Sequence, residues 1–330
     1  MRISRSLVWT WVFCTIGVSS QWLRGDEPQP SPLENGDIYS LCGGDCCPET
    51  CCSDECCDCT CDCHRLLGML PSDHCFDSFV SPLSNPFFFE DPRQLTEVRG
   101  IFLDNSLPNS IGGGDVHVWA AQLRGRLTKN FSVIAPRLGY FQVNEPGGAP
   151  VGFPSAPVGF KYTFLRDVER QFLVSGGITY FIPENLNNFE LPSDGDFHFF
   201  LTGGKQIFDR GHWLSATGFR IPLDRNWGTQ FWYWSNQWDY EVVDRWYGLL
   251  GINWFHWMSS SNNIGADITG LDLLNVPAGG VAGTNVVSAL AGVKWKPRPN
   301  VEIGTGFEFP LTNREDILRN RLYVDAILRY

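Results

Sequence analysis

Three features of the sequence predict an all-β fold, an antiparallel up-and-down transmembrane β-barrel of about twelve strands, preceded by a largely irregular Cys-rich N-terminal segment. Aromatic residues make up 14% of the 330 residues, while charged residues make up only 18%. Beyond the N-terminus no apolar run is long enough for a membrane helix. Apolar and polar side chains alternate in stretches of about ten residues, which favours strands crossing a membrane over a soluble β-sandwich.

Residues 1–25 have the features of a secretory signal peptide. Arg2 and Arg5 precede an apolar run from Leu7 to Val18, which is short for a span and suitable for export. Cleavage is expected after Ser20 or near Gly25. A retained anchor and a lipoprotein on Cys14 are the alternatives, although bulky residues precede this cysteine. The mature protein is therefore expected to leave the cytoplasm.

Residues 26–94 are interpreted as a Pro/Cys-rich periplasmic segment and linker. The stretch from Asp26 to Gly36 is polar and Pro-rich, which predicts a disordered leader. The stretch from His64 to Pro92 contains Phe87, Phe88 and Phe89 in a row. We expect it to pack either at the barrel entrance or inside the lumen, and the sequence does not distinguish these positions.

A dense cysteine block lies within residues 42–63. Its ten members are Cys42, Cys46, Cys47, Cys51, Cys52, Cys56, Cys57, Cys59, Cys61 and Cys63. In an exported protein such a set favours disulfides, either within the segment or as an envelope crosslink. A thiolate cluster for a soft metal, assisted by His64, is the second interpretation, and tolerated biased composition is the third. The leading expectation is therefore no cofactor.

Residues 95–330 are predicted to form the barrel. The candidate strands lie near 97–104, 115–126, 130–143, 157–165, 170–182, 196–207, 212–221, 227–236, 244–257, 285–296, 300–309 and 320–330. Short turns alternate with long loops along this series, as expected when all turns lie on one side of a membrane. Two connections fit less well: 222–226 is short for an outer loop, and 237–243 is long for an inner turn.

Side-chain alternation predicts which residues face the lumen. In strand 300–309, Val301, Ile303 and Phe307 share one face, while Glu302 and Glu308 share the other. The predicted lumen-lining residues are Lys161, Lys294, Lys296, Glu302, Glu308, Arg321, Asp325 and Arg329. Tryptophans near strand ends are expected to form interfacial girdles; they are Trp119, Trp213, Trp227, Trp232, Trp234, Trp246, Trp254 and Trp257.

The final strand resembles the C-terminal signature of bacterial outer-membrane β-barrel proteins. Its apolar face ends on an aromatic residue and consists of Leu322, Val324, Ala326, Leu328 and Tyr330. The resemblance covers about residues 95–330, and it implies location in the outer membrane, contact with its lipid and recognition of this strand by the barrel-assembly machinery. The wider chain, including residues 85–93, is similar to exported barrel proteins with a Cys-rich N-terminal segment.

The expected function is a narrow, porin-like channel for the passive passage of small solutes. The alternatives are an envelope-anchoring barrel with the cysteine block as its tether, and, more distantly, a secreted β-sandwich. The histidines His117, His198, His212 and His256 lie near no recognisable nucleophile motif, so we do not expect an enzyme. A net charge of −11 argues against nucleic acid as a partner, because phosphate binding requires clustered Lys and Arg.

Overall fold

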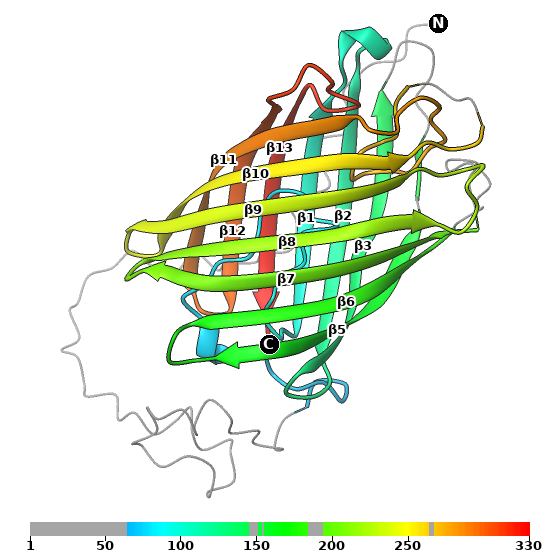
Figure 1. Cartoon of the computed structure of the whole chain (residues 1–330). Helices are drawn as coiled ribbons and strands as arrows, with labels where there is room; N and C mark the ends of the chain where they lie inside the picture. Colours follow the sequence, from blue (N-terminus) through cyan, green and yellow to red (C-terminus); the bar gives the residue numbers. More distant parts are fainter. Residues whose placement is uncertain (1–64, 145–150, 154, 184–193, 264–266) are drawn as a thin grey trace, which may run out of the picture. The chain divides into compact units, whose positions relative to one another are not determined.

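The computed structural model describes residues 65–144, 151–153, 155–183, 194–263 and 267–330. Antiparallel strands close into a barrel, because β2 pairs with both β1 and β3 (Figure 1). The twelve barrel strands are β1 (Glu97–Ser106), β2 (Asp115–Arg126), β3 (Phe131–Asn144), β5 (Ala156–Asp167), β6 (Phe172–Ile182), β7 (Asp196–Phe208), β8 (Gly211–Pro222), β9 (Gln230–Val243), β10 (Trp246–Ser259), β11 (Asn285–Arg298), β12 (Val301–Pro310) and β13 (Asn320–Arg329). The two-residue β4 (Val151–Gly152) pairs with the edge of β3. This topology confirms the predicted fold class.

The sequence prediction was wrong at β9. A strand near 227–236 followed by a turn at 237–243 was expected, whereas the structure has one strand from Gln230 to Val243. Trp238 and Tyr240 are exposed and Asp239 between them is buried, so the alternation of the strand continues through the expected turn. The chain reverses at Asp244–Arg245, where Arg245 adopts a φ of 64°.

The two ends of the barrel differ in their connections. The strands are joined by short turns at the end that carries the C-terminus, which we call the turn end. At the opposite loop end the connections are longer, and the longest runs from 260 to 284. Because β9 extends to Val243, every connection between strands at the turn end is short.

The outer face of the barrel is apolar and aromatic. Phe160, Tyr162 and Phe164 on β5 are all at least 46% exposed, whereas Lys161 and Thr163 between them are buried. Polar groups on this face are satisfied locally, since Trp232 Nε1 donates to Thr217 at 2.8 Å and Trp234 Nε1 donates to Ser215 at 3.0 Å. Lipid leaves such groups no water to bond with, so these bonds suit a lipid-facing surface.

One tryptophan faces the other way. Trp257, predicted to join an interfacial girdle, is fully buried inside the barrel. It shares its face of β10 with the buried Phe255 and Leu249, and strand alternation therefore directs it inward. Among the described residues, no helix is long and apolar enough to cross a membrane.

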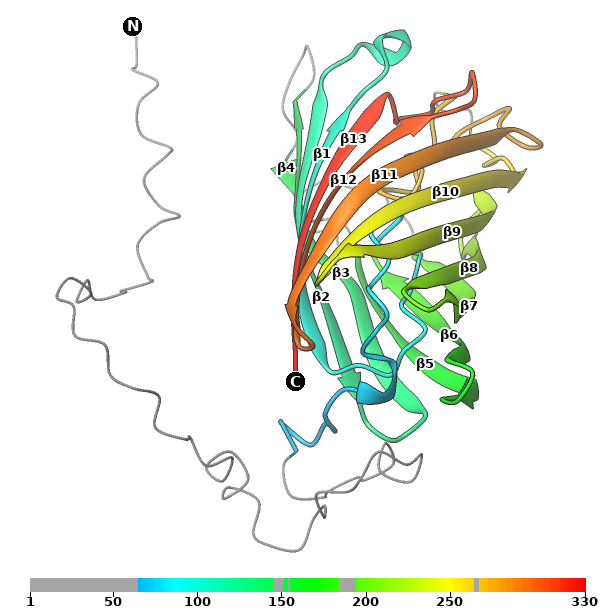
Figure 2. The ribbon, with the colours of Figure 1, turned by 90° about the vertical axis from the view of Figure 1, so that its left-hand side faces the viewer.

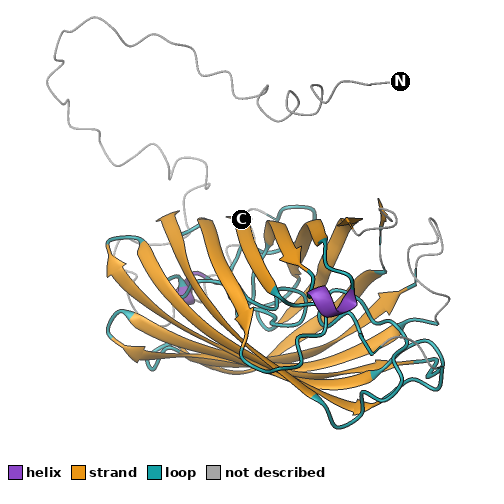
Figure 3. Ribbon diagram, turned by 90° about the horizontal axis from the view of Figure 1, so that it is seen from above, coloured by secondary structure: helices purple, strands orange, loops and turns teal. Residues whose placement is uncertain are grey.

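The barrel interior is filled by chain from outside the strands. Residues 70–96, which we call the plug segment, rise from a short 3-10 helix (His74–Phe76) at the turn end and return inside the ring of strands to β1 (Figure 2). Five phenylalanines of this segment are at most 2% exposed: Phe76, Phe79, Phe87, Phe88 and Phe89. Loop segments are also seen inside the ring from above (Figure 3). The plug segment therefore lies in the lumen and not merely at its entrance.

Candidate functional site: the occupied lumen

The eight predicted lumen-lining residues all lie inside the barrel. Lys161, Lys294, Lys296, Glu302, Glu308, Arg321, Asp325 and Arg329 are between 0% and 6% exposed. Side chains lining an open aqueous channel would be accessible to water. Their burial shows that they contact protein, and the contacts come from the plug segment, from neighbouring strands and from loop 260–284, which we call the outer loop.

Glu90 of the plug segment is held between two cations of the wall. Arg124 on β2 donates from Nε and Nη2 to its two carboxylate oxygens, both at 2.7 Å, and Lys161 on β5 donates at 2.9 Å. Burial alone would raise the pKa of Glu90, but Arg124 and Lys161 outweigh burial and bring it to about 2. Glu90 is therefore ionised at neutral pH.

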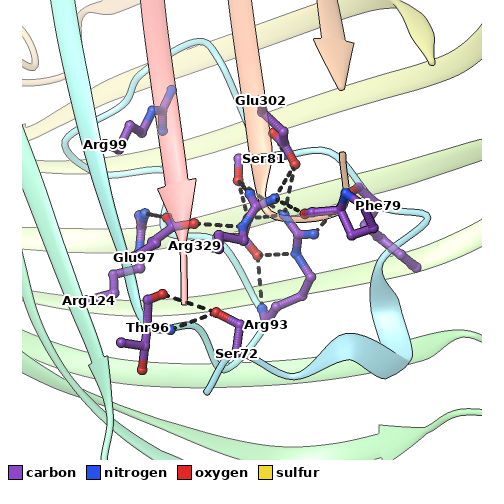
Figure 4. A network of polar contacts seen from close by, with 12 residues as sticks. Ser72, Phe79, Ser81, Arg93, Thr96, Glu97, Arg99, Arg124, Glu302 and Arg329 are labelled. Atoms are coloured by element: carbon purple, nitrogen blue, oxygen red, sulfur yellow. Dashed lines mark hydrogen bonds and ion pairs between the residues drawn. The ribbon is translucent and has the colours of Figure 1, made fainter. Parts of the chain in front are cut away.

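A second group of polar contacts surrounds Arg93 of the plug segment. Both Arg93 and Arg329 of β13 donate to the Ser81 hydroxyl (Figure 4). Arg93 donates to the two oxygens of Asp91 at 3.0 and 2.8 Å, and despite burial this guanidinium holds the pKa of Asp91 below its usual range. Arg329 donates to Glu97 at 2.8 Å, to Glu302 at 2.6 Å and to the Ser81 hydroxyl at 2.8 Å. The network thus links the plug segment to β1, β12 and β13.

Neighbouring strands complete the charged layer. Lys294 on β11 donates to Glu302 at 3.2 Å and to Asp325 at 3.0 Å, and Arg99 on β1 lies 2.7 Å from Asp325. Lys296 donates to the Phe79 carbonyl of the plug segment at 2.9 Å. Buried charges are tolerated only when they are paired in this manner.

The tip of the plug segment has little regular structure, so its backbone groups need partners from the wall. The Leu83 amide donates to Gln237 at 2.9 Å, and the Pro86 carbonyl accepts from Gln122 at 2.5 Å. The Phe88 carbonyl accepts from the Tyr233 hydroxyl at 2.7 Å. Polar wall residues on β2 and β9 therefore take the place of a strand ladder.

An aromatic layer lies between the plug tip and the loop end. Phe88 packs against Phe181 and Phe231 with ring centroids 5.7 and 5.4 Å apart. The guanidinium groups of Arg137 and Arg220 lie 5.3 and 4.7 Å from the Phe181 centroid. These cation–π contacts fix two arginines beneath the outer loop.

The outer loop closes the lumen from the loop end. Arg321 donates to both oxygens of Asp272 at 2.9 and 2.8 Å, Arg220 donates to the Leu274 carbonyl at 3.0 Å, and Arg137 donates to the Leu273 carbonyl. Leu271 and Leu273 are 1% exposed. The described part of the chain therefore inserts two segments into the lumen, one from each side.

The barrel combines a closed antiparallel ring of strands, an aromatic outer face, and short turns at one end with longer loops at the other. The chain has the fold of the outer-membrane β-barrels. No family model matches the chain, and no curated protein matches it in sequence.

Several solved structures of this barrel class are similar to the chain. The NanC porin has a TM-score of 0.46 at 8% identity, covering 71% of this chain and 98% of the porin. The KdgM porin has a TM-score of 0.41 at 9% identity, covering 71% and 99%. The translocator domain of the autotransporter NalP from Neisseria meningitidis has a TM-score of 0.44 at 9% identity, covering 71% and 87%. At such identities these similarities concern the barrel fold alone.

The four histidines considered for catalysis lie apart in the barrel. His212 Nδ1 lies 2.7 Å from Asp239 in a buried pair, and the ring of Phe79 covers it at 4.3 Å. His198 contacts the Tyr233 hydroxyl at 3.0 Å inside the barrel, whereas His117 and His256 are only partly buried near the loop end. The plug segment therefore covers a fully buried His–Asp pair.

The cysteine block and the signal peptide fall outside the described residues. Cys75, in the 3-10 helix of the plug segment, is disulfide-bonded, and all other cysteines of the chain precede residue 65. The described residues contain no group of His, Cys, Asp and Glu suited to a metal ion. Disulfide and metal roles for the block remain predictions.

The terminal strand lies where the ring closes. On β13 the side chains of Leu322, Val324 and Leu328 are exposed on the outer face, while Ala326 and Tyr330 continue this face. β13 pairs with β1 along its full length. Recognition of this strand by assembly machinery stays a prediction.

Sequence reasoning missed the acidic residues of the plug segment and several basic residues of the wall. Glu90, Asp91 and Arg93 follow directly after the phenylalanine run, but nothing in their spacing shows that they enter the lumen. Arg124 was detectable, because it shares the face of β2 that carries Val116 and Val118. The missed basic residues are Arg99, Arg124, Arg126, Arg137 and Arg220.

Proposed function

We propose that this protein is an outer-membrane channel for small solutes that its own plug segment holds closed at rest. Membrane location is supported by the aromatic outer face and by the export signal expected at the N-terminus. The closed state is supported by the burial of all eight predicted lumen-lining residues.

The observation that supports a gated channel is the polar contact between the plug segment and the wall. The middle layer of this contact consists of ion pairs and hydrogen bonds, including those of Glu90, Lys161, Ser81 and Arg329. Buried ion pairs add little net stability compared with well-packed apolar side chains. A permanent filling gains little from such charges, whereas surfaces that separate into water need them.

An envelope-anchoring barrel is the second candidate. It is favoured by the two separate inserts, and the cysteine block expected to crosslink the N-terminal segment fits the same role. In that case the plug segment would stay in place and the barrel would hold the Cys-rich segment at the membrane.

Conductance of the purified full-length protein in a planar bilayer tests the proposal. We expect the wild type to be mostly silent, and the double variant Glu90→Gln/Asp91→Asn to open often, because Arg124 and Lys161 of the wall lose the Glu90 carboxylate and Arg93 of the plug segment loses Asp91. A matched control, Glu169→Gln/Asp209→Asn, removes the same charge from exposed turns and should resemble the wild type.

Folding of each variant is checked by its heat-modifiable migration on gels. A steady current through the wild type would contradict the closed state. Silence of a correctly folded double variant would reject gating by the plug segment and support the anchoring barrel.

A further inference from the structure

The buried charges of the barrel wall are unequal in sign. Among the described residues, ten buried basic and six buried acidic side chains lie on the strands, a net charge of +4. The basic ones are Arg99, Arg124, Arg126, Arg137, Lys161, Arg220, Lys294, Lys296, Arg321 and Arg329. The acidic ones are Glu97, Asp196, Asp239, Glu302, Glu308 and Asp325.

The segments that enter the lumen carry the opposite excess. Their buried charges are the acidic Asp73, Glu90, Asp91 and Asp272 and the single basic Arg93, a net charge of −3. The inserts therefore neutralise most of the excess positive charge of the wall. Removal of the inserts would leave a narrow lumen with a basic lining.

The neutralisation is local as well as global. The acceptors that Lys161 contacts all belong to the plug segment: the Glu90 carboxylate at 2.9 Å and the Asp91 and Arg93 carbonyls, both at 2.7 Å. Arg124 presents two nitrogens to the same carboxylate. The planar guanidinium of Arg124 and the ammonium group of Lys161 thus surround one carboxylate, an arrangement typical of carboxylate binding.

We propose that the opened lumen selects anions, and that Arg124 and Lys161 bind the carboxylate of a small solute at the position that Glu90 occupies in the closed state. This inference rests on the proposed channel function and names its substrate class. A basic lining in a narrow, water-filled pore raises the local concentration of anions and excludes cations. The plug segment is then a tethered competitor of the solute.

Ion selectivity of the Glu90→Gln/Asp91→Asn variant tests the first part. In a potassium chloride gradient its reversal potential should show preference for chloride. Adding Lys161→Gln should reduce that preference, whereas Lys205→Gln, which removes an exposed lysine from the outer face of β7, should leave it unchanged. Preference for potassium would overturn the proposal.

Competition with the plug segment tests the second part without requiring any current. Hydrogen exchange of residues 82–92 in the wild-type protein should accelerate in sodium succinate relative to sodium chloride of equal ionic strength. Neutral succinamide should have no effect, and Lys161→Gln should weaken the response to succinate. Equal exchange in succinate and chloride would overturn binding at this position.

The two measurements separate the proposals. A folded double variant that stays silent rejects the channel, while a response to succinate would still show the carboxylate site. A variant that conducts but prefers potassium, in a protein that does not respond to succinate, keeps the channel and rejects the anion class.

Discussion

The plug segment and the outer loop both enter the lumen, but they are fastened in different ways. The plug segment is held largely through charged side chains, with Glu90 on Arg124 and Lys161 and with Asp73 on Arg166. The outer loop offers mainly main-chain carbonyls, those of Leu273 and Leu274, to wall arginines. Asp272 is its charged contact with Arg321.

This difference indicates which insert is more easily displaced when its contacts with the wall are changed. Carbonyl acceptors persist whatever side chain stands at their position, so the outer loop depends on its shape. A carboxylate is lost on protonation, on substitution or by competition with a soluble anion. The plug segment is therefore the insert that a solute or a mutation should release first.

Arg124→Met should have the largest effect, because it leaves the Glu90 and Glu97 carboxylates buried without their shared guanidinium. Removing one partner of a buried ion pair costs about 3–5 kcal/mol, and we expect a loss of this order in the free energy of unfolding. Urea titration in detergent, followed by heat-modifiable gel migration, measures it.

The control for this prediction is Arg170→Met. Arg170 pairs with Asp167 at 3.4 Å on the surface, and its side chain is 84% exposed, so its removal should change stability very little. Equal effects of the two substitutions would show that the Arg124 network contributes no more than a surface pair.

Acid should loosen the plug segment when Glu90 becomes protonated. Ordinary glutamate titrates near 4.5, and burial opposed by Arg124 and Lys161 gives Glu90 a pKa of about 2. A lowered pKa means that ionisation stabilises the folded state above pH 4.5 and that this stability, about 3 kcal/mol, is lost as pH falls toward 2.

Hydrogen exchange of residues 82–92 as a function of pH measures this loss, after correction for the pH dependence of intrinsic exchange. Asp91 has its pKa lowered as well and stays ionised through most of this range. The variant Glu90→Gln should lack the transition. An unchanged transition in that variant would assign it to another group.

The fold was predictable because a strand that faces lipid on one side and protein on the other alternates visibly. β12 and β13 show this in Ile303, Phe307 and Leu322 on the outside and in Glu302 and Arg321 on the inside. The inward direction of Lys161 and Lys294 follows from the same rule. At β9 the rule also held, but the turn was expected too early, since the strand continues to Val243.

The contents of the lumen were not predictable to the same degree. Periodicity reports which side of a strand faces inward, but it does not report what fills the space inside. The plug segment has no period, and its partners Ser235 and Gln237 are separated from Asn85 and Leu83 by about half the chain. Such contacts depend on closure of the whole ring, which no local pattern encodes.

Asp272→Asn should have the smallest effect of the three changes. Arg321 loses its carboxylate pair but keeps the Asn105 side chain at 2.8 Å and the Tyr323 hydroxyl at 2.9 Å, so a loss of about 2 kcal/mol or less is expected. Faster hydrogen exchange should be confined to residues 267–276, and Asp267→Asn, an exposed change in the same loop, should leave exchange unaltered. If residues 82–92 exchanged faster to the same extent, the two inserts would be one cooperative unit, and the plug segment could not be released alone.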